Sequence, residues 1–371
     1  MPVENFNIAD AIKSAYEKAL STRGHVNILI AGKTGTGKST LVNTIFSGRI
    51  AETGQGRPVT QHMRKYTKDG SPVSIYDSKG LELSEYKQIL GELITEVRKL
   101  NRSENPEDHI HVSWLCIAEG ARRFEDAEVE LAQALDGMNI PVIIVITTAI
   151  SDQGFRSEVE KAFDMARNVV RVNCLPVEVD DGVVLPVKGV DDLVDITMEV
   201  VPKGQKNAFA AAQRIKVDHK VNQSRVAIVA AAASAAAVGI VPIPFSDAVA
   251  IIPIQISMLA AISVIFGLNL TNGFLTTLVA TSLTSTSGAF GGRALVGGLL
   301  KLIPGAGSIL GGAISAGVAI ALTTAFGEAY IAVLKQIFTD DPDSIPEAAD
   351  IAEALKEKMK SVSPTLLLKK S

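Results

Sequence analysis

Apolar and polar positions follow two different patterns along this chain. Up to about residue 203, short apolar runs alternate with segments whose apolar residues recur at helical spacing. The apolar runs predict strands at residues 26–31, 73–76, 112–118, 141–147 and 183–187, and the segments between them predict helices near residues 38–46, 84–100, 126–135, 157–170 and 190–200. This alternation is typical of a mostly parallel sheet with helices on both faces. We therefore expect an α/β domain in the first half.

The second half is nearly free of charge. Between Arg225 and Glu328, only Asp247, Arg293 and Lys301 are charged. This change in composition places a domain boundary near residues 202–210 and predicts an all-α, Ala/Gly-rich helical domain after it. We expect four parts: an N-terminal amphipathic helix (1–22) that packs on the next domain, the α/β domain (23–203), the apolar helical domain (204–338), and a C-terminal helix and tail (339–371).

The apolar half raises the question of a membrane, because a spanning helix needs about 20 largely apolar residues. The run from Val226 reaches Pro242 after only sixteen residues, 226–241. Residues 305–327 have the length, but they are rich in Gly, Ala and Ser, which also suits a tightly packed bundle. Asp247 either caps the helix after it or faces a polar partner. Both a bundle, soluble or lying against a membrane, and true insertion are compatible with the sequence.

The candidate chemistry follows the first predicted strand. Glycines at 32, 35 and 37 let successive backbone N–H groups point at a polyphosphate bound at a helix N-terminus. Lys38 then reaches the β- and γ-phosphates, and the Ser39 hydroxyl coordinates Mg²⁺. The expected phosphate-binding residues are Gly32, Thr34, Gly35, Thr36, Gly37, Lys38, Ser39 and Thr40.

Two further segments lie where a phosphate site needs them. The strand at 73–76 leads into Asp77-Ser78-Lys79-Gly80, whose carboxylate can reach Mg²⁺ and whose Gly80 N–H can contact the γ-phosphate. Thr60 ends a polar, glycine-containing loop (52–60) and can supply a second hydroxyl to Mg²⁺. The alternatives are an ordinary turn after the strand and a plain connecting loop.

The loop at 32–39, Thr60 and the segment 77–80 resemble the first three motifs of translation-factor-type GTPases. The run Gly-Arg-Pro-Val-Thr ending at Thr60 resembles the Era/Der-like bacterial GTPases and the immunity-related GTPases. This resemblance covers roughly residues 24–202 and implies a six-stranded sheet, GTP or GDP with Mg²⁺ as ligands, and hydrolysis of GTP. The Ala-rich run followed by Pro242-Ile-Pro-Phe-Ser-Asp247 resembles the YcjF-like helical domain found behind bacterial G domains.

The base-reading motif departs from the family pattern. At the end of the strand at 141–147, the resemblance implies Asn/Thr-Lys-x-Asp, whereas this chain has Thr147-Thr148-Ala149-Ile150. Ile150 stands where an aspartate pairs with guanine, so that discrimination is missing or has moved to Asp152. The last base-side motif is best matched by Val187 and Lys188, which could equally form a simple strand-to-helix turn. Preference for guanine over adenine therefore rests on the resemblance.

A second departure concerns hydrolysis. Leu81 follows Gly80, where many family members have a glutamine that orients the attacking water. Intrinsic hydrolysis is then slow or assisted from elsewhere. Arg57 is a candidate for that assistance, because it stands three residues before Thr60, the spacing at which heterotrimeric G-protein α subunits carry their internal arginine finger. The alternative is an arginine in a solvated loop. The expected catalytic set is Lys38, Thr60, Gly80 and Arg57, and the expected metal ligands are Ser39, Thr60 and Asp77.

Net charge and cysteine content indicate which partners and which cellular compartment to expect. The formal charge of -4 gives no reason to expect nucleic acid, and Cys116 and Cys174 are expected as unpaired thiols of a cytoplasmic protein. The first hypothesis is a Mg²⁺-dependent GTPase whose nucleotide state changes how the helical half, through residues 226–330, meets the cytoplasmic face of a membrane or a second copy in a homodimer. The alternatives are a nucleotide-gated scaffold with negligible turnover and a GTPase-coupled channel or transporter.

Overall fold

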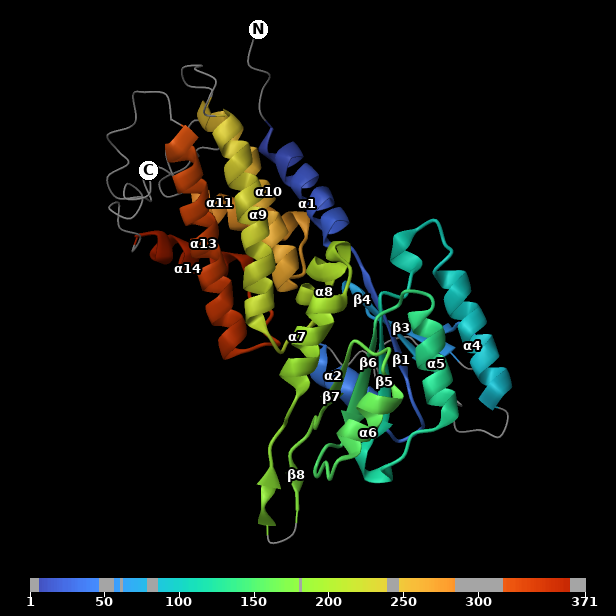
Figure 1. Ribbon diagram of the computed structural model, residues 1–371. Coiled ribbons are helices and arrows are strands. Elements are labelled where there is room, and N and C mark those ends of the chain that lie inside the picture. The colour runs from blue at the N-terminus through green and yellow to red at the C-terminus, as the bar shows by residue number, and fades with distance from the viewer. Residues whose placement is uncertain are drawn as a thin grey trace. The chain divides into compact units, whose positions relative to one another are not determined.

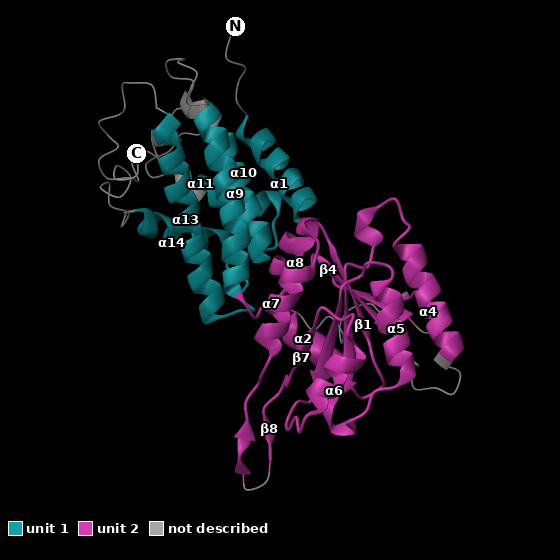
Figure 2. Cartoon of the chain, in the orientation of Figure 1, with its two compact units in different colours: residues 1–23, 217–371 teal, residues 24–216 magenta. Residues whose placement is uncertain are grey.

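The computed structural model describes residues 7–46, 57–60, 63–78, 86–179, 182–238, 247–283 and 316–360. The chain forms two compact units, which Figure 2 distinguishes by colour. One unit comprises residues 24–216, and the other comprises residues 1–23 together with 217–371. We call them the α/β unit and the helical unit and describe each by itself.

The α/β unit is built on a seven-stranded sheet in the order β2-β3-β4-β1-β5-β6-β7 (Figure 1). Strands β4, β1, β5, β6 and β7 are parallel, and β3 and the two-residue β2 pair antiparallel at one edge. The predicted six-stranded, mostly parallel sheet is confirmed, with β2 as a short addition. The strands are β1 (Val26–Ala31), β2 (Arg57–Pro58), β3 (Met63–Thr67), β4 (Val73–Ser78), β5 (Val112–Ala118), β6 (Val142–Thr147) and β7 (Asn168–Arg171).

Helices cover both faces of this sheet, so the central strands β1, β5 and β6 are buried at nearly every position. Alternate residues of β1, β5 and β6 pack against α4, α5 and α6, through side chains such as Leu90, Leu131 and Phe155. On the other face, the Trp114 ring stacks on Phe46, and its indole N–H donates to Thr197 at 3.1 Å. The helices are α2 (Lys38–Ile45), α4 (Tyr86–Leu100), α5 (Asp126–Asp136), α6 (Phe155–Ala162), α7 (Val190–Val200) and α8 (Lys206–Ala212).

Two of the predicted elements are wrong. The helix predicted at 157–170 ends at Ala162, and β7 (Asn168–Arg171) forms the sixth main strand, since an apolar run this short fits both helical and strand spacing. The strand predicted at 183–187 does not join the sheet. It forms β9 (Val184–Leu185), which pairs only with β8 (Val177–Glu178) in a separate two-stranded ribbon. Val184 is 57% exposed, so its apolar character does not report burial.

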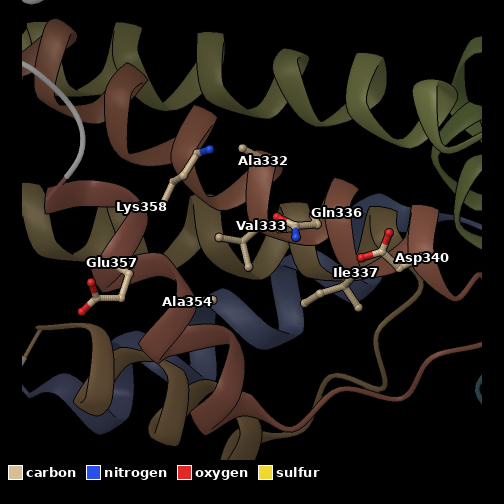
Figure 3. A pocket seen from close by; sticks show the side chains of 8 residues that line it. All are labelled: Ala332, Val333, Gln336, Ile337, Asp340, Ala354, Glu357 and Lys358. Atoms are coloured by element: carbon tan, nitrogen blue, oxygen red, sulfur yellow. The ribbon is translucent and has the colours of Figure 1, made fainter.

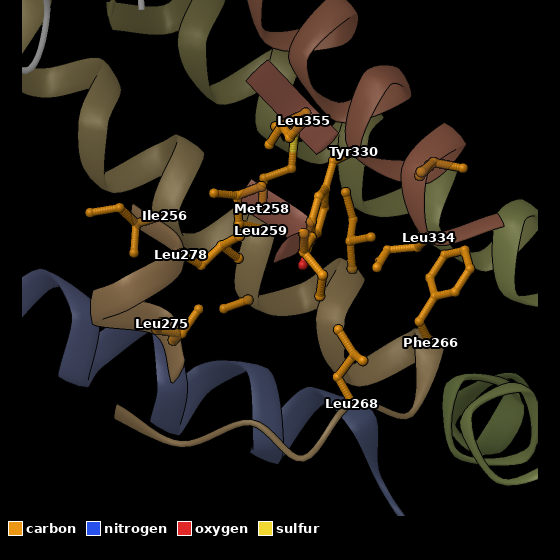
Figure 4. Close-up of a cluster of buried hydrophobic side chains, with 14 of the residues drawn as sticks. Ile256, Met258, Leu259, Phe266, Leu268, Leu275, Leu278, Tyr330, Leu334 and Leu355 are labelled. Atoms are coloured by element: carbon orange, nitrogen blue, oxygen red, sulfur yellow. The ribbon is translucent and has the colours of Figure 1, made fainter. Parts of the chain in front are cut away.

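The helical unit has an apolar core shared by all of its described helices (Figure 4). Helix α13 packs along α9, α10 packs on α1 and α9, and α14 packs on α11 and α13. Gly327 allows the close approach of α13, because a Cβ atom there would lie 2.6 Å from the Ile228 Cγ1 atom. The helices are α1 (Ile8–Arg23), α9 (Val217–Val238), α10 (Asp247–Phe266), α11 (Asn272–Leu283), α13 (Ala316–Asp340) and α14 (Ala348–Lys360).

The structure corrects two expectations about the parts of the chain. Helix α1 packs in the helical unit rather than on the α/β domain, since its buried Ile12, Ala15 and Ala19 belong to the core of α9 to α14. The boundary between the units lies after Lys216 rather than at 203, because α8 and the residues after it stay with the α/β unit. There, the Arg214 guanidinium donates to the carbonyl of Thr44 at 2.9 Å.

The described helices include none with both the length and the apolar character needed to cross a membrane. The candidate span at 305–327 begins among residues that the structure does not describe. Pro242 and the side chain of Asp247 also lie outside the described part of the chain. Between α13 and α14, a cavity of about 450 Å³ is lined by a mixture of apolar and charged side chains (Figure 3). These are Ala332, Val333, Gln336, Ile337, Asp340, Ala354, Glu357 and Lys358.

A buried histidine ties β1 to the segment before β5. The His111 side chain accepts the Asn27 N–H at Nδ1 (2.9 Å) and donates from Nε2 to the Pro106 carbonyl (3.1 Å), which assigns the neutral ring. A second proton, on Nδ1, would point at the Asn27 N–H and break this hydrogen bond. Burial lowers the pKa of His111 from 6.5 to about 4.

Acidification should therefore destabilise the α/β unit. Between pH 6.5 and about 4, the unfolded chain binds a proton that the folded His111 does not, so stability is full above pH 6.5 and falls as the pH drops through this window. The loss is on the order of 2–3 kcal/mol. Urea unfolding at pH 7 and at pH 4.5, followed by the fluorescence of Trp114, measures it.

The variant His111→Asn isolates this contribution, because its amide oxygen can still accept the Asn27 N–H without titrating. We expect the wild-type chain to lose more stability than the variant between the two pH values. An equal loss in both would contradict the assignment to His111.

Candidate functional site

The loop between β1 and α2 has the backbone of a phosphate cradle. Gly35 and Gly37 adopt left-handed φ angles of 82° and 79°, and a Cβ atom at either would meet nothing within 4 Å. Gly32 lies against β5, where a Cβ atom would be 2.3 Å from the Cys116 carbonyl oxygen. Helix α2 begins at Lys38 without a side-chain cap and without acidic residues in its first turn. Its first N–H groups can therefore receive an anion.

Side chains fix the shape of this loop. The Lys38 ammonium donates to the carbonyls of Gly32 (2.7 Å) and Lys33 (2.9 Å). Lys33 forms an ion pair with Glu125, the residue before α5. Its carbonyl also accepts the Thr36 hydroxyl at 2.9 Å. The positive charge of Lys38 is thus held at the loop itself.

Burial shifts the pKa values of two groups close to the loop. Burial raises the pKa of the Cys116 thiol, which lies under Gly32, to about 12, so the thiol stays neutral. Burial also raises the pKa of Glu128, which accepts the Glu125 N–H at the start of α5. Cys116 and Cys174 are free thiols, as the sequence predicts for two unpaired cysteines.

Asp77 lies beside the start of the loop, because β4 and β1 are parallel neighbours with Asp77 opposite Ile30. Ser39 stands in the first turn of α2. A carboxylate and a hydroxyl are the oxygen ligands that Mg²⁺ takes from proteins, and water and substrate phosphates supply the remainder. The residues present therefore fit a magnesium ion bound together with a nucleotide.

Backbone pairing brings Thr60 toward the same end of the sheet. The Thr60 N–H donates to the Met63 carbonyl at 3.1 Å, and Met63 lies opposite Ser78 at the end of β4. Arg57 belongs to β2, but its side chain is outside the described part of the chain, as are Gly80 and Leu81. The roles expected of these three residues stay predictions.

Of the base-side residues, Thr147 ends β6, and Thr148 and Asp152 lie in the loop after it. Thr148 has a left-handed φ of 51°, which is uncommon for a β-branched residue. The Asp152 carboxylate accepts the Arg156 N–H at 2.8 Å and lies 3.7 Å from the Arg171 Nε atom. Ile150 is 48% exposed. The loop offers a carboxylate at Asp152, although not at the usual position.

Lys188 pairs with Asn173, which follows β7, the strand next to β6 in the sheet. Its N–H and carbonyl both pair with Asn173, each at 2.9 Å. Val187 and Lys188 follow the β8–β9 ribbon rather than a strand of the main sheet, which differs from the predicted arrangement. Helix α7 begins at once, after Gly189 with a left-handed φ of 71°.

Sequence reasoning missed two residues of this region. Glu119 follows β5 and is 2% exposed, and it forms an ion pair with Arg171 at the end of β7. A charged residue directly after an apolar strand at the ligand edge of a parallel sheet is a signal for Glu119. Arg171 carried no such signal, since residues 157–170 were expected to form a helix.

Comparisons with known proteins match the two halves separately. A family model described as "50S ribosome-binding GTPase" matches residues 27–148, and one described as "Domain of unknown function (DUF697)" matches residues 205–361. GTPase Era from two strains of Vibrio vulnificus is 26% identical over 199 residues, which are 52% of this chain and 58% of the relative. The chain therefore spans little more than half the length of these curated relatives.

Solved structures show a weaker likeness. A probable GTP-binding protein engB is 16% identical and covers 47% of this chain and 98% of its own, with a TM-score of 0.32. Era in complex with MgGDPNP and a segment of 16S ribosomal RNA is 16% identical and covers 48% and 58%, with a TM-score of 0.32. Likeness at this level carries no inference about ligands. Residues 27–148 thus match a GTPase family and residues 205–361 match a domain of unknown function, in agreement with the resemblance to Era-like P-loop GTPases followed by a YcjF-like helical domain.

Proposed function

We propose that this chain binds GTP with Mg²⁺ and hydrolyses the β–γ phosphoanhydride with water, giving GDP and phosphate. The observation that carries the proposal is the loop between β1 and α2, with left-handed Gly35 and Gly37, the Lys38 ammonium and an uncapped helix N-terminus. It lies in a domain of the GTPase family. A neutral or acidic loop would not suit a polyphosphate.

Each residue near the loop has a role in this proposal. The N–H groups of Gly35 to Thr40 bind the phosphates, and Lys38 neutralises charge on the β- and γ-phosphates as it develops. Ser39, Asp77 and Thr60 would hold Mg²⁺, which when bound supplies further positive charge to the same phosphate oxygens. The Gly80 N–H would contact the γ-phosphate.

Guanine is the proposed base. Asp152 offers the carboxylate that the two neighbouring N–H groups of guanine require, and Thr147, Thr148, Val187 and Lys188 complete the base side. Support comes from the family match and from the place of Asp152 in the loop that follows β6, at the ligand edge of the sheet.

The nucleotide state is proposed to change the conformation or assembly of the helical unit of a cytoplasmic protein. Residues 226–330 are the proposed contact with the cytoplasmic face of a membrane or with a second copy. Extraction of a membrane fraction with high salt tests the first, and a protein released only by detergent would contradict peripheral contact. The absence of a nucleic-acid partner stays a prediction without support from relatives, since one Era structure contains ribosomal RNA.

Lys38→Ala should abolish tight GTP binding and lower the rate of single-turnover phosphate release by about 100-fold or more, the usual effect of removing a group that stabilises transition-state charge. Titration with a fluorescent GDP analogue and a phosphate-release assay measure the two effects. Lys99→Ala, which removes an exposed lysine of α4, is the matched control.

Retained binding and release in Lys38→Ala would contradict the proposal. Tight binding by the wild-type chain without release would favour the nucleotide-gated scaffold. In the same assay, Arg57→Ala should slow release without weakening binding if Arg57 acts as an arginine finger in cis, and an unchanged rate would exclude that role.

Two glycines of the loop should respond differently to alanine. Gly35→Ala adds a methyl group in open space, so it costs only the left-handed strain, roughly 1–2 kcal/mol. Gly32→Ala places its methyl group 2.3 Å from the Cys116 carbonyl, so the loop or β5 must move. Urea unfolding followed by Trp114 should show the larger loss for Gly32→Ala, and equal losses would contradict the close packing of this loop on β5.

A further inference from the structure

Glu119 connects the ends of three parallel strands. It follows β5 directly and is 2% exposed. Its Oε2 atom accepts the N–H groups of Ile150 (2.6 Å) and Ser151 (2.7 Å), which follow β6, and its Oε1 atom accepts from Arg171 Nε (2.7 Å) at the end of β7. One carboxylate thus fixes the position of the base-side loop in the sheet.

The loop that Glu119 holds has a strained backbone. In the described part of the chain, four non-glycine residues have positive φ angles, and three of them, Arg122, Thr148 and Gln153, lie in the loops after β5 and β6. Arg122 also donates to the Ser151 carbonyl at 2.9 Å, so Ser151 is bound from both sides. Strain of this kind persists only where the surroundings impose it, and it concentrates at ligand sites.

The contacts to Glu119 limit what can read a base. Glu119 already accepts the N–H groups of Ile150 and Ser151, so neither N–H group is available to a base. Asp152 is the acidic side chain nearest to the usual position, and it is 33% exposed. Its Oδ1 atom lies 3.7 Å from Arg171 Nε, the same atom that donates to Glu119. Arg171 therefore bridges Glu119 and Asp152.

A buried carboxylate loses its hydration, so a fold retains one only where several donors replace water. Here all the donors named belong to the base-side loop or to Arg171. A neutral residue could fill the same space. It could not accept hydrogen bonds from the N–H groups of Ile150 and Ser151 and from the Arg171 guanidinium at the same time.

We infer that Glu119, together with Arg171, is a positioning residue for purine recognition. It holds the loop at 147–152 and orients the Asp152 carboxylate toward the adjacent N–H groups of guanine, without touching the nucleotide. The inference rests on the proposed function and adds to it the residues that determine which base is accepted.

The test compares GDP with ADP on the full chain. Glu119→Gln keeps the shape of the side chain but leaves one oxygen for three donors, so the loop loses part of its support. We expect the ratio of ADP to GDP dissociation constants to fall at least tenfold, mainly through weaker GDP binding, while Glu119→Asp retains part of the preference. Calorimetric titration with each nucleotide gives the ratio, and Trp114 fluorescence confirms that each variant is folded.

Glu128→Gln is the matched control. Glu128 is also 2% exposed and also accepts a backbone N–H, that of Glu125, but it has no contact with the base-side loop among the interactions described. This variant should lose stability without changing the ratio. If Glu119→Gln does not fold, Arg171→Lys serves instead, because a single ammonium cannot span both carboxylates, and the ratio should fall again.

Three results would overturn the inference: an unchanged ratio in folded Glu119→Gln, an equal fall in Glu128→Gln, or a wild-type chain that binds GDP and ADP equally. A wild-type chain that binds neither nucleotide would instead overturn the proposed function.

Discussion

The parallel pairing of β1 with both β4 and β5 determines where the chemistry of the α/β unit lies. Ile30 is opposite Asp77 on one side and opposite Trp114 on the other, so the residues after all three strands meet at one edge of the sheet. The phosphate loop, the candidate metal ligand Asp77 and Glu119 are brought together by this register. A shift of two residues in either pair would separate them by a full pleat repeat.

The same register explains why the loop is packed so tightly. Gly32 begins the turn where β1 ends, directly over the Cys116 carbonyl of β5, and only a residue without a Cβ atom fits there. Gly35 and Gly37 have another reason, since their φ angles are left-handed while their surroundings are open. The glycines of the motif thus perform two different tasks, one in packing and one in leaving backbone N–H groups accessible.

Local patterns predicted the elements whose burial is uniform. Strands β1, β5 and β6 are buried at nearly every position, so their apolar runs identified them, and the loop at 32–40 followed from its glycines and Lys38. Prediction failed where apolar side chains are exposed, as at Val183 and Val184, or where a short strand fits helical spacing, as at β7. The Glu119–Arg171 pair joins residues 52 positions apart, which no local pattern encodes.

The two units differ in how the chain builds them. The α/β unit is continuous from Gly24 to Lys216, whereas the helical unit combines α1 with the helices from Val217 onward. The apolar face of α1, with Ile12, Ala15 and Ala19, therefore gains its partners only after the whole α/β unit has been synthesised. The chain joins the units at two peptide bonds, Arg23–Gly24 and Lys216–Val217. A change of backbone position at these bonds would reach α1 and α9 through the chain itself.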